Sequence, residues 1–326
     1  MSAAAALSEV PGRLEKVFLN TENEIAQSGI YAVNFHTLGL PHTVVIDDYL
    51  PLREWGTGYK TLFAHVGEDS GLWGPILEKA FAKYHGNYMH IAGGDPAIAL
   101  RTLSGAPYTD FYHDAKTIDE LWDAIVEHDN ANEMIQGGTN GGNDTQTNAD
   151  GLVLGHAYTV LSHAILSTGT RLVKLRNPWA SESFHGDWSK DSTLWTDALR
   201  AEVGEDLAND GFFFMSIENY HAQVAYTEFN MDTTDWHTAS FLKLGDNTAA
   251  ENPGSYSWCG SSCTRHYLNL TSDVEQTVYV TAHTWDNRGV SKDCRISLGD
   301  KPHNIHVPHE NYIQAFYGGS RQLTPF

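Results

Sequence analysis

The pattern of apolar residues typical of amphipathic helices occurs only in the first two thirds of this 326-residue chain. This difference between the two parts of the chain is the feature that most constrains the fold. Apolar side chains in 73–84 recur at helical spacing, and Gly86 suits the C-terminal end of that helix. The stretch 117–127 predicts a second amphipathic helix with Thr117 as its N-cap. From about Trp236, short strand-like runs alternate with Gly, Asn and Pro turns. That pattern is typical of an antiparallel β-sandwich.

The segments before this change predict a mixture of helices and strands. Residues 1–20 predict a helix that continues through "RLEKVF", and 29–51 predicts a β-hairpin. Residues 137–151 are rich in Gly, Asn and Thr and nearly free of apolar side chains, so they predict a mobile loop. After that loop we expect two strands, within 155–166 and 170–179, joined by "STGT".

The charge and cysteine content exclude several classes of function. The chain has 41 acidic and 20 basic residues, a formal net charge of −21, which disfavours a nucleic-acid partner. No stretch reaches the ~18–20 apolar residues of a membrane span, and the first residues lack the basic region of a signal peptide. We therefore expect a cytoplasmic protein. The cysteines are Cys259, Cys263 and Cys294, an odd and sparse set that favours structural thiols over a disulfide framework.

Two polar residues stand at the ends of the paired strands. His156 opens the first strand and Asn177 closes the second, so a turn centred between Leu166 and Ser167 would place them opposite each other. A carboxamide oxygen can fix the tautomer of an imidazole whose other nitrogen takes a proton from a thiol. Papain-like proteases use this Cys-His-Asn arrangement, and Trp179 could shield its hydrogen bond from water. From spacing alone, a structural histidine and a turn-forming Asn-Pro pair remain open alternatives.

The blocks "GHAYTV", "RLVKLRNPW", "GDWS" and "NDGFFFMSIENY" together resemble the catalytic core of the calpains. Upstream, "GIYAVNFHTLGLPHTVVIDDYLP" and "LWGPILEKAFAKYHGNY" are similar to that family in the same order. The resemblance covers about residues 1–230 and implies an α+β fold, a papain-like, two-lobed cysteine protease core. It implies that His156 is the catalytic histidine and Asn177 its orienting asparagine. It also implies that 236–326 is a shortened form of the family's β-sandwich.

The resemblance implies a nucleophile that the sequence does not contain. Residues 1–13 resemble the continuation of a family helix that begins with a motif like Gly-Asp-Cys-Trp-Phe. The cysteine is then expected roughly one helical turn before Met1, which leaves the first lobe incomplete. We expect a calpain-type endopeptidase of intracellular limited proteolysis, acting on protein substrates, whose chain from 1 to 326 is inactive. The alternative is an inactive calpain-like pseudoprotease that binds a protein or a membrane, although 236–326 holds no basic cluster to favour a membrane.

Calcium dependence is a further property that the resemblance implies. In the family, acidic side chains of each lobe bind calcium, an ion that prefers oxygen ligands. Here Gly71 stands at the first-lobe position, and Ser183, Lys190 and Phe212 stand at positions of the second lobe. Asp210 is a weak remnant of that second set. The residues seen require no cofactor, and we expect calcium activation to be weakened or lost.

Overall fold

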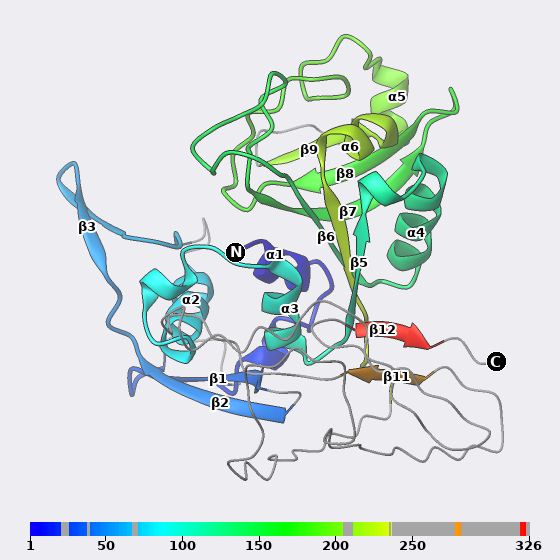
Figure 1. Cartoon of the computed structure of the whole chain (residues 1–326). Coiled ribbons are helices and arrows are strands. Elements are labelled where there is room, and N and C mark those ends of the chain that lie inside the picture. The colour runs from blue at the N-terminus through cyan, green and yellow to red at the C-terminus, as the bar shows by residue number, and fades with distance from the viewer. Residues whose placement is uncertain are drawn as a thin grey trace, which may run out of the picture.

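The computed structural model describes residues 1–20, 26–37, 40–66, 71–204, 211–234, 236, 278–281 and 320–323. Helices and antiparallel sheets combine in two lobes, with α1 between them, and this confirms the predicted α+β class (Figure 1). No helix within these ranges is long and apolar enough to cross a membrane.

The first lobe packs helices against a β-hairpin. The predicted hairpin is confirmed, because β1 and β2 pair antiparallel from Ile30 opposite Asp47 to Thr37 opposite Leu40. The helix predicted over 73–84 is also confirmed, and Gly86 follows its C-cap with a φ of +101°. A second hairpin, β3–β4, pairs with no other described strand. The elements of this lobe are α1 (Ser2–Ser8), the 3₁₀ helix η1 (Glu15–Val17), β1 (Ile30–Thr37), β2 (Leu40–Asp47), β3 (Leu52–Trp55), β4 (Gly58–Thr61), α2 (Trp73–Tyr84), the 3₁₀ helix η2 (Tyr88–Ile91) and α3 (Pro96–Ser104).

The first helix is shorter than its sequence predicts. A helix through residue 20 was expected, but α1 ends at Ser8 and only the short η1 follows. Pro11 disfavours helical backbone at the residue before it, and Gly12 has a φ of +85°, so the chain turns there. Ala3, Ala4 and Ala6 of α1 are buried in the first-lobe core.

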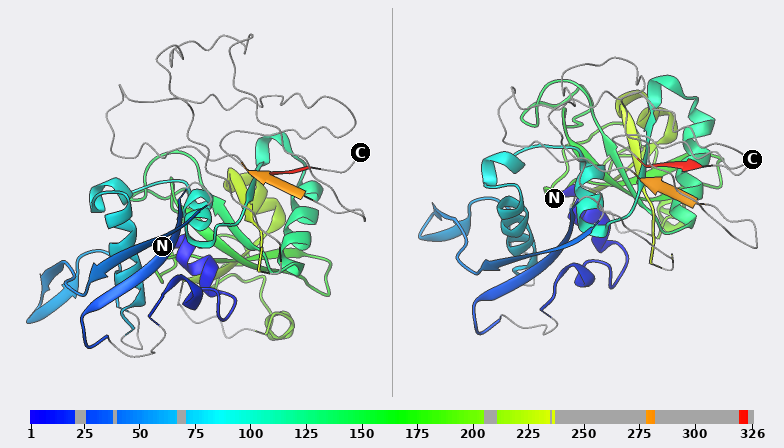
Figure 2. Two further views of the ribbon diagram at one scale, coloured as in Figure 1. Left: turned by 90° about the horizontal axis from the view of Figure 1, so that it is seen from below. Right: turned by 60° about the horizontal axis from the view of Figure 1, so that its bottom comes forward.

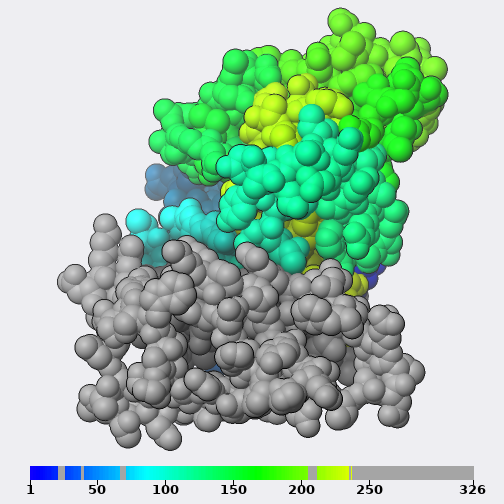
Figure 3. All heavy atoms as spheres, turned by 45° about the vertical axis from the view of Figure 1, so that its right-hand side comes forward, coloured from blue at the N-terminus to red at the C-terminus, as the bar shows by residue number. Residues whose placement is uncertain are grey.

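The second lobe is a six-stranded antiparallel sheet in the order β5-β10-β6-β7-β8-β9. Helices α4 and α6 contact each other and lie side by side on one face of the lobe (Figure 3). Thr117 and Glu120 form a capping box at the start of α4, which confirms the predicted N-cap. The elements are β5 (Tyr108–Tyr112), the 3₁₀ helix η3 (His113–Ala115), α4 (Ile118–Asn130), β6 (Met134–Gly138), β7 (Ala157–Ile165), β8 (Arg171–Arg176), α5 (Asp197–Glu202), β9 (Phe212–Ser216), α6 (Ile217–Gln223) and β10 (Tyr226–Asn230).

The loop predicted over 137–151 begins later than expected. Gly137 and Gly138 belong to the buried strand β6, and neighbouring tyrosines occupy the space that their side chains would fill. A Cβ at Gly137 would lie 2.3 Å from Tyr220 Oη, and one at Gly138 would lie 2.1 Å from Tyr226 Cζ. Glycine is therefore required here for close packing and not for a turn.

Hydrogen bonds connect the sheet to the first lobe. The side-chain amide of Gln136 in β6 is oriented with its nitrogen toward Pro96 O. In this orientation its oxygen accepts a hydrogen bond from Ala3 N at 3.1 Å. Glu228 and Asn230 of β10 bind the backbone of Ala97, through its N–H at 3.0 Å and its carbonyl at 3.2 Å respectively. We call this polar interface between the sheet and the helices α1 and α3 the interlobe seam.

The predicted β-sandwich over 236–326 lies almost wholly outside the described residues. Within it, β11 (Val278–Thr281) pairs antiparallel with β12 (Ser320–Leu323). The three cysteines also lie outside the described ranges.

Candidate active site

The side chains of His156 and Asn177 meet at the end of the β7–β8 pair. His156 Nε2 lies 3.0 Å from Asn177 Oδ1. The same oxygen accepts the Trp179 backbone N–H at 3.1 Å, which fixes the orientation of the amide. Because an amide oxygen only accepts, Nε2 must carry the hydrogen, and Nδ1 is the basic nitrogen of the neutral ring.

The predicted proximity is present, but the strand register that produces it differs from the expected one. Ile165 pairs with Arg171, so the turn is centred on Thr168 and not between Leu166 and Ser167. The register also shifts between Val160 and Ser162, an irregularity that sequence spacing cannot reveal. Continued past β8, this register places Asn177 opposite Tyr158, so its side chain reaches His156 diagonally.

Two aromatic rings enclose the imidazole of His156. The Trp179 ring lies 4.4 Å away between centroids, and the Tyr158 ring lies 5.0 Å away at 82°. Asn177 is 1% exposed, whereas Trp179 is 47% exposed. The Trp179 ring therefore contacts the imidazole and is partly open to solvent.

Burial is the main influence on the His156 pKa, which it lowers from the ordinary value. The hydrogen bond to Asn177 and the charge of Asp144 act in the opposite direction. The Met1 amino group also lowers the pKa, so the start of α1 lies within electrostatic reach of the ring. A neutral imidazole whose Nδ1 can accept a proton is the form required of a general base.

Two residues that support the site carry no recognisable signal in the sequence. Thr139 Oγ1 accepts the His156 N–H at 3.0 Å, and the Thr139 N–H donates to the His156 carbonyl at 3.0 Å. Gly211 O accepts the Asn177 N–H at 2.8 Å, and a Cβ on Gly211 would lie 2.9 Å from Asn177 O. Thr139 fell within the predicted loop, which is why its role was missed.

The expected calcium positions do not supply a set of oxygen ligands. Ser183 Oγ donates to Gly151 O at 2.7 Å, and Lys190 carries an ammonium group. The Phe212 ring has Lys174 Nζ at 5.0 Å and Arg176 Cζ at 5.1 Å, so this position is surrounded by positive charge. Gly71 has no side-chain donor, and Asp210 lies outside the described residues. The described positions Gly71, Ser183, Lys190 and Phe212 do not fit a calcium ion.

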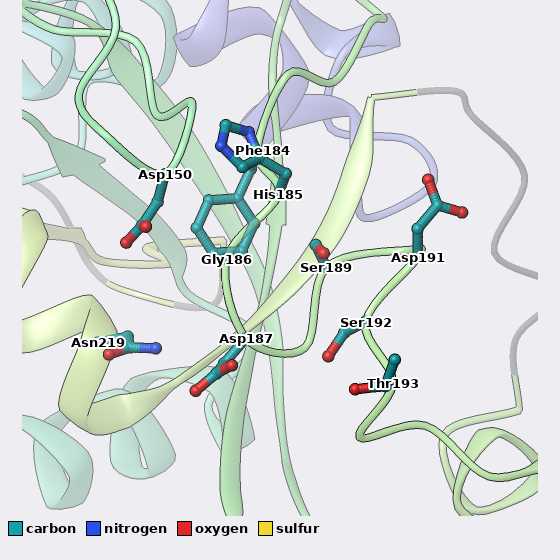
Figure 4. A pocket seen from close by; sticks show the side chains of 10 residues that line it. All are labelled: Asp150, Phe184, His185, Gly186, Asp187, Ser189, Asp191, Ser192, Thr193 and Asn219. Atoms are coloured by element: carbon teal, nitrogen blue, oxygen red, sulfur yellow. The ribbon is translucent and has the colours of Figure 1, made fainter.

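A polar cavity of about 530 Å³ lies along the loop after Trp179 (Figure 4). It does not include His156 or Asn177. Asp150 in its wall already accepts from Gln223 Nε2 at 2.8 Å. Within the described ranges, no group of three or more His, Cys, Asp or Glu side chains is arranged to hold a metal ion. The cavity is lined by Asp150, Phe184, His185, Gly186, Asp187, Ser189, Asp191, Ser192, Thr193 and Asn219.

Comparison with known proteins gives one consistent result. The calpain family of cysteine proteases matches residues 1–230. The calpain-type cysteine protease DEK1 of Arabidopsis thaliana is 34% identical over 228 residues, covering 68% of this chain and 10% of the relative. Calpain-12 of Mus musculus is 30% identical over 266 residues, covering 79% of this chain and 34% of the relative. The chain thus spans about a tenth of the plant protein and about a third of the mouse protein. It belongs to the calpain family of cysteine proteases.

Proposed function

We propose that His156 and Asn177 are the histidine and asparagine of a calpain-type endopeptidase active site that acts on proteins. The 3.0 Å contact between His156 Nε2 and Asn177 Oδ1 carries the proposal, because it leaves Nδ1 as the proton acceptor. The position of α1 supports it, since the Met1 amino group lies within electrostatic reach of the same ring. A cysteine one helical turn ahead of Met1 would extend α1 toward His156.

The proposed reaction uses His156 as both base and acid. Nδ1 takes the proton of the thiol, and the thiolate attacks the carbonyl carbon of the scissile peptide bond. The C–N bond then breaks, and the proton passes from His156 to the leaving amine. A water molecule next gives its proton to Nδ1 and attacks the thioester, which releases the acid and restores the thiol. Asn177 holds the imidazole in the required tautomer throughout.

The test compares the chain 1–326 with the same chain extended by Gly-Asp-Cys-Trp-Phe ahead of Met1. We expect no His156-dependent digestion of labelled casein by the chain 1–326, because Cys259, Cys263 and Cys294 all lie outside the family core matched over residues 1–230. In the extended chain, we expect iodoacetamide to alkylate the new cysteine at a pH well below that needed for an ordinary thiol. His156→Ala should abolish that shift, and Asn177→Ala should weaken it.

The need for a cysteine ahead of Met1 and the assignment of His156 can each fail separately. Casein digestion by the chain 1–326 that disappears in His156→Ala would show that a cysteine ahead of Met1 is not required. Ordinary reactivity of the new cysteine in the extended chain, unchanged by His156→Ala, would refute the assignment of His156. A folded extended chain with this second behaviour would favour the alternative, a pseudoprotease that binds without chemistry.

We also propose that the core of this chain does not depend on calcium. The charges around Phe212 and the ammonium group of Lys190 support this, since cations repel a calcium ion. The melting temperature of the chain should therefore be the same in calcium chloride and in EGTA. A rise in the melting temperature of the unaltered chain on addition of calcium would contradict this proposal.

A further inference from the structure

The β3–β4 hairpin projects from the first lobe, as two views of the molecule show (Figure 2; Figure 1 labels β3). Its strands pair only with each other among the described strands. Residues 52–60 are all exposed, and Thr61 is the first buried position. Trp55 is 54% exposed and Tyr59 is 70% exposed, so two large aromatic side chains are held in solvent on a projecting arm. Exposed aromatic groups of this kind are characteristic of interaction sites.

One face of the hairpin combines an indole ring with two cations. Arg53 is paired with Lys60, and Trp55 with Gly58, so these side chains share a face. Arg53 Cζ lies 5.0 Å and Lys60 Nζ 4.6 Å from the centre of the Trp55 ring. Neither cation forms an ion pair with a residue in the described ranges. We call Arg53, Trp55 and Lys60 the cationic face.

The opposite face differs in charge. Glu54 is paired with Tyr59, and both point away from the cationic face because neighbouring residues of a strand alternate. The negative charge of the hairpin is thus kept apart from its two positive charges. In a chain of net charge −21, two cations around an exposed indole that have no acidic partner in the described part of the chain are an unusual local feature.

The hairpin is connected to the region of the start of α1. After β4, the Phe63 ring stacks on Tyr88 at 4.4 Å, and the Ala64 N–H donates to Glu78 Oε2 at 2.8 Å. Glu78 in turn acts electrostatically on the Met1 amino group. The segment that follows the hairpin is therefore held against η2 and α2 of the first lobe, and Glu78 of α2 is near the Met1 amino group.

We propose that the cationic face of the β3–β4 hairpin is a docking site for an extended acidic segment of a protein partner. Carboxylates would pair with Arg53 and Lys60, and the apolar side chains between them would lie on Trp55. Each strand of the hairpin also has an edge that no described strand occupies, which suits the addition of an extended peptide. That the partner is a substrate rests on the proposed protease function, whereas the binding itself does not.

The test measures binding to the intact chain 1–326 by fluorescence anisotropy. The probe is a fluorescein-labelled peptide of about ten residues that alternates Glu and Val. We expect saturable binding that weakens several-fold on raising NaCl to about 0.5 M, since exposed charges are screened. A peptide with Lys in place of Glu should show no binding that depends on Arg53 and Lys60. Because no cleavage is measured, failure of the proposed catalysis would leave this result unaffected.

Substitutions in the hairpin test whether the cationic face is the site that binds the peptide. Arg53→Glu/Lys60→Glu should reduce affinity at least about tenfold, and Trp55→Ala several-fold. The matched control, Lys116→Glu/Lys190→Glu, makes the same change of net charge at exposed lysines of the second lobe and should have less than about a twofold effect. Glu54→Gln, on the opposite face, should not weaken binding. The melting temperature of each variant establishes that it is folded.

Three outcomes would overturn the proposal. The first is no binding of the acidic peptide, and the second is an equal loss of binding in the hairpin variant and its charge-matched control. The third is hairpin-dependent binding to phosphatidylserine–phosphatidylcholine vesicles without peptide binding, which would identify a lipid surface as the partner.

Discussion

Replacement of Glu228 by Gln should make the protein more stable at neutral pH. Glu228 lies in the interlobe seam, is 3% exposed and accepts the Ala97 N–H at 3.0 Å. Burial raises the pKa of its carboxyl to about 9, and the charges of Asp95 and Asp110 act in the same direction. At neutral pH, a protonated Glu228 therefore donates a hydrogen bond to Asp95 across the seam.

The sign of the pH dependence follows from proton binding. Between the ordinary pKa of 4.5 and the folded value of about 9, the folded state holds a proton on Glu228 that the unfolded state has lost. The free energy of unfolding therefore falls as pH rises, by at most about 1.4 kcal/mol per unit. Between about pH 5.5 and 7.5, the loss from this group amounts to about 3 kcal/mol.

A glutamine side chain reproduces the protonated acid at every pH. Its oxygen can accept from Ala97 N and its NH₂ group can donate to Asp95. Glu228→Gln should therefore match the wild type near pH 5 and exceed it by about 3 kcal/mol near pH 7.5. Urea unfolding followed by tryptophan fluorescence at several pH values measures both quantities.

Glu228→Ala is the control, because it removes both hydrogen bonds and should destabilise the protein across the whole pH range. The reasoning is refuted if Glu228→Gln keeps the wild-type pH slope. It is equally refuted if that variant is less stable than the wild type near pH 7.5.

Two further substitutions test the packing of the second lobe by the same unfolding assay. Thr117→Ala should lower the free energy of unfolding by about 1 kcal/mol, because it removes the capping box of α4; an unchanged value would show that Glu120 caps the helix alone. Gly137→Ala should cost about 1–3 kcal/mol, since the new Cβ would lie 2.3 Å from Tyr220 Oη, and Tyr220→Phe should relieve part of this cost. An equal cost in both backgrounds would locate the strain elsewhere.

The most accurate predictions from the sequence concern elements whose residue pattern lies within the element itself. The helix over 73–84 has an apolar stripe at helical spacing, and Thr117 and Glu120 stand three residues apart before an apolar run. Both features arise within one element, so no knowledge of its neighbours is needed. The same holds for the alternating side chains of β1 and β2.

Features that depend on distant parts of the chain were not predictable. Gly137 lies in a strand because it pairs with Tyr158 and Thr227, and it must be glycine because Tyr220 fills the space beside it. The contact between His156 and Asn177 was anticipated, but the irregular register near Val160 that sets its geometry was not. Nothing local indicated that Thr139 would hold the backbone of His156.

The interlobe seam has a mechanical consequence. Each lobe keeps an apolar core of its own, whereas Gln136, Glu228 and Asn230 cross between them through hydrogen bonds. Water can replace such bonds at a small net loss, typically about 1 kcal/mol for each. A few degrees of rotation between the lobes would therefore exchange polar contacts for hydration, although Met134 of β6, which packs in the first-lobe core, would have to adjust. The distance from the start of α1 to His156 would change with that angle, so the joint between the lobes is a natural place from which to adjust the site.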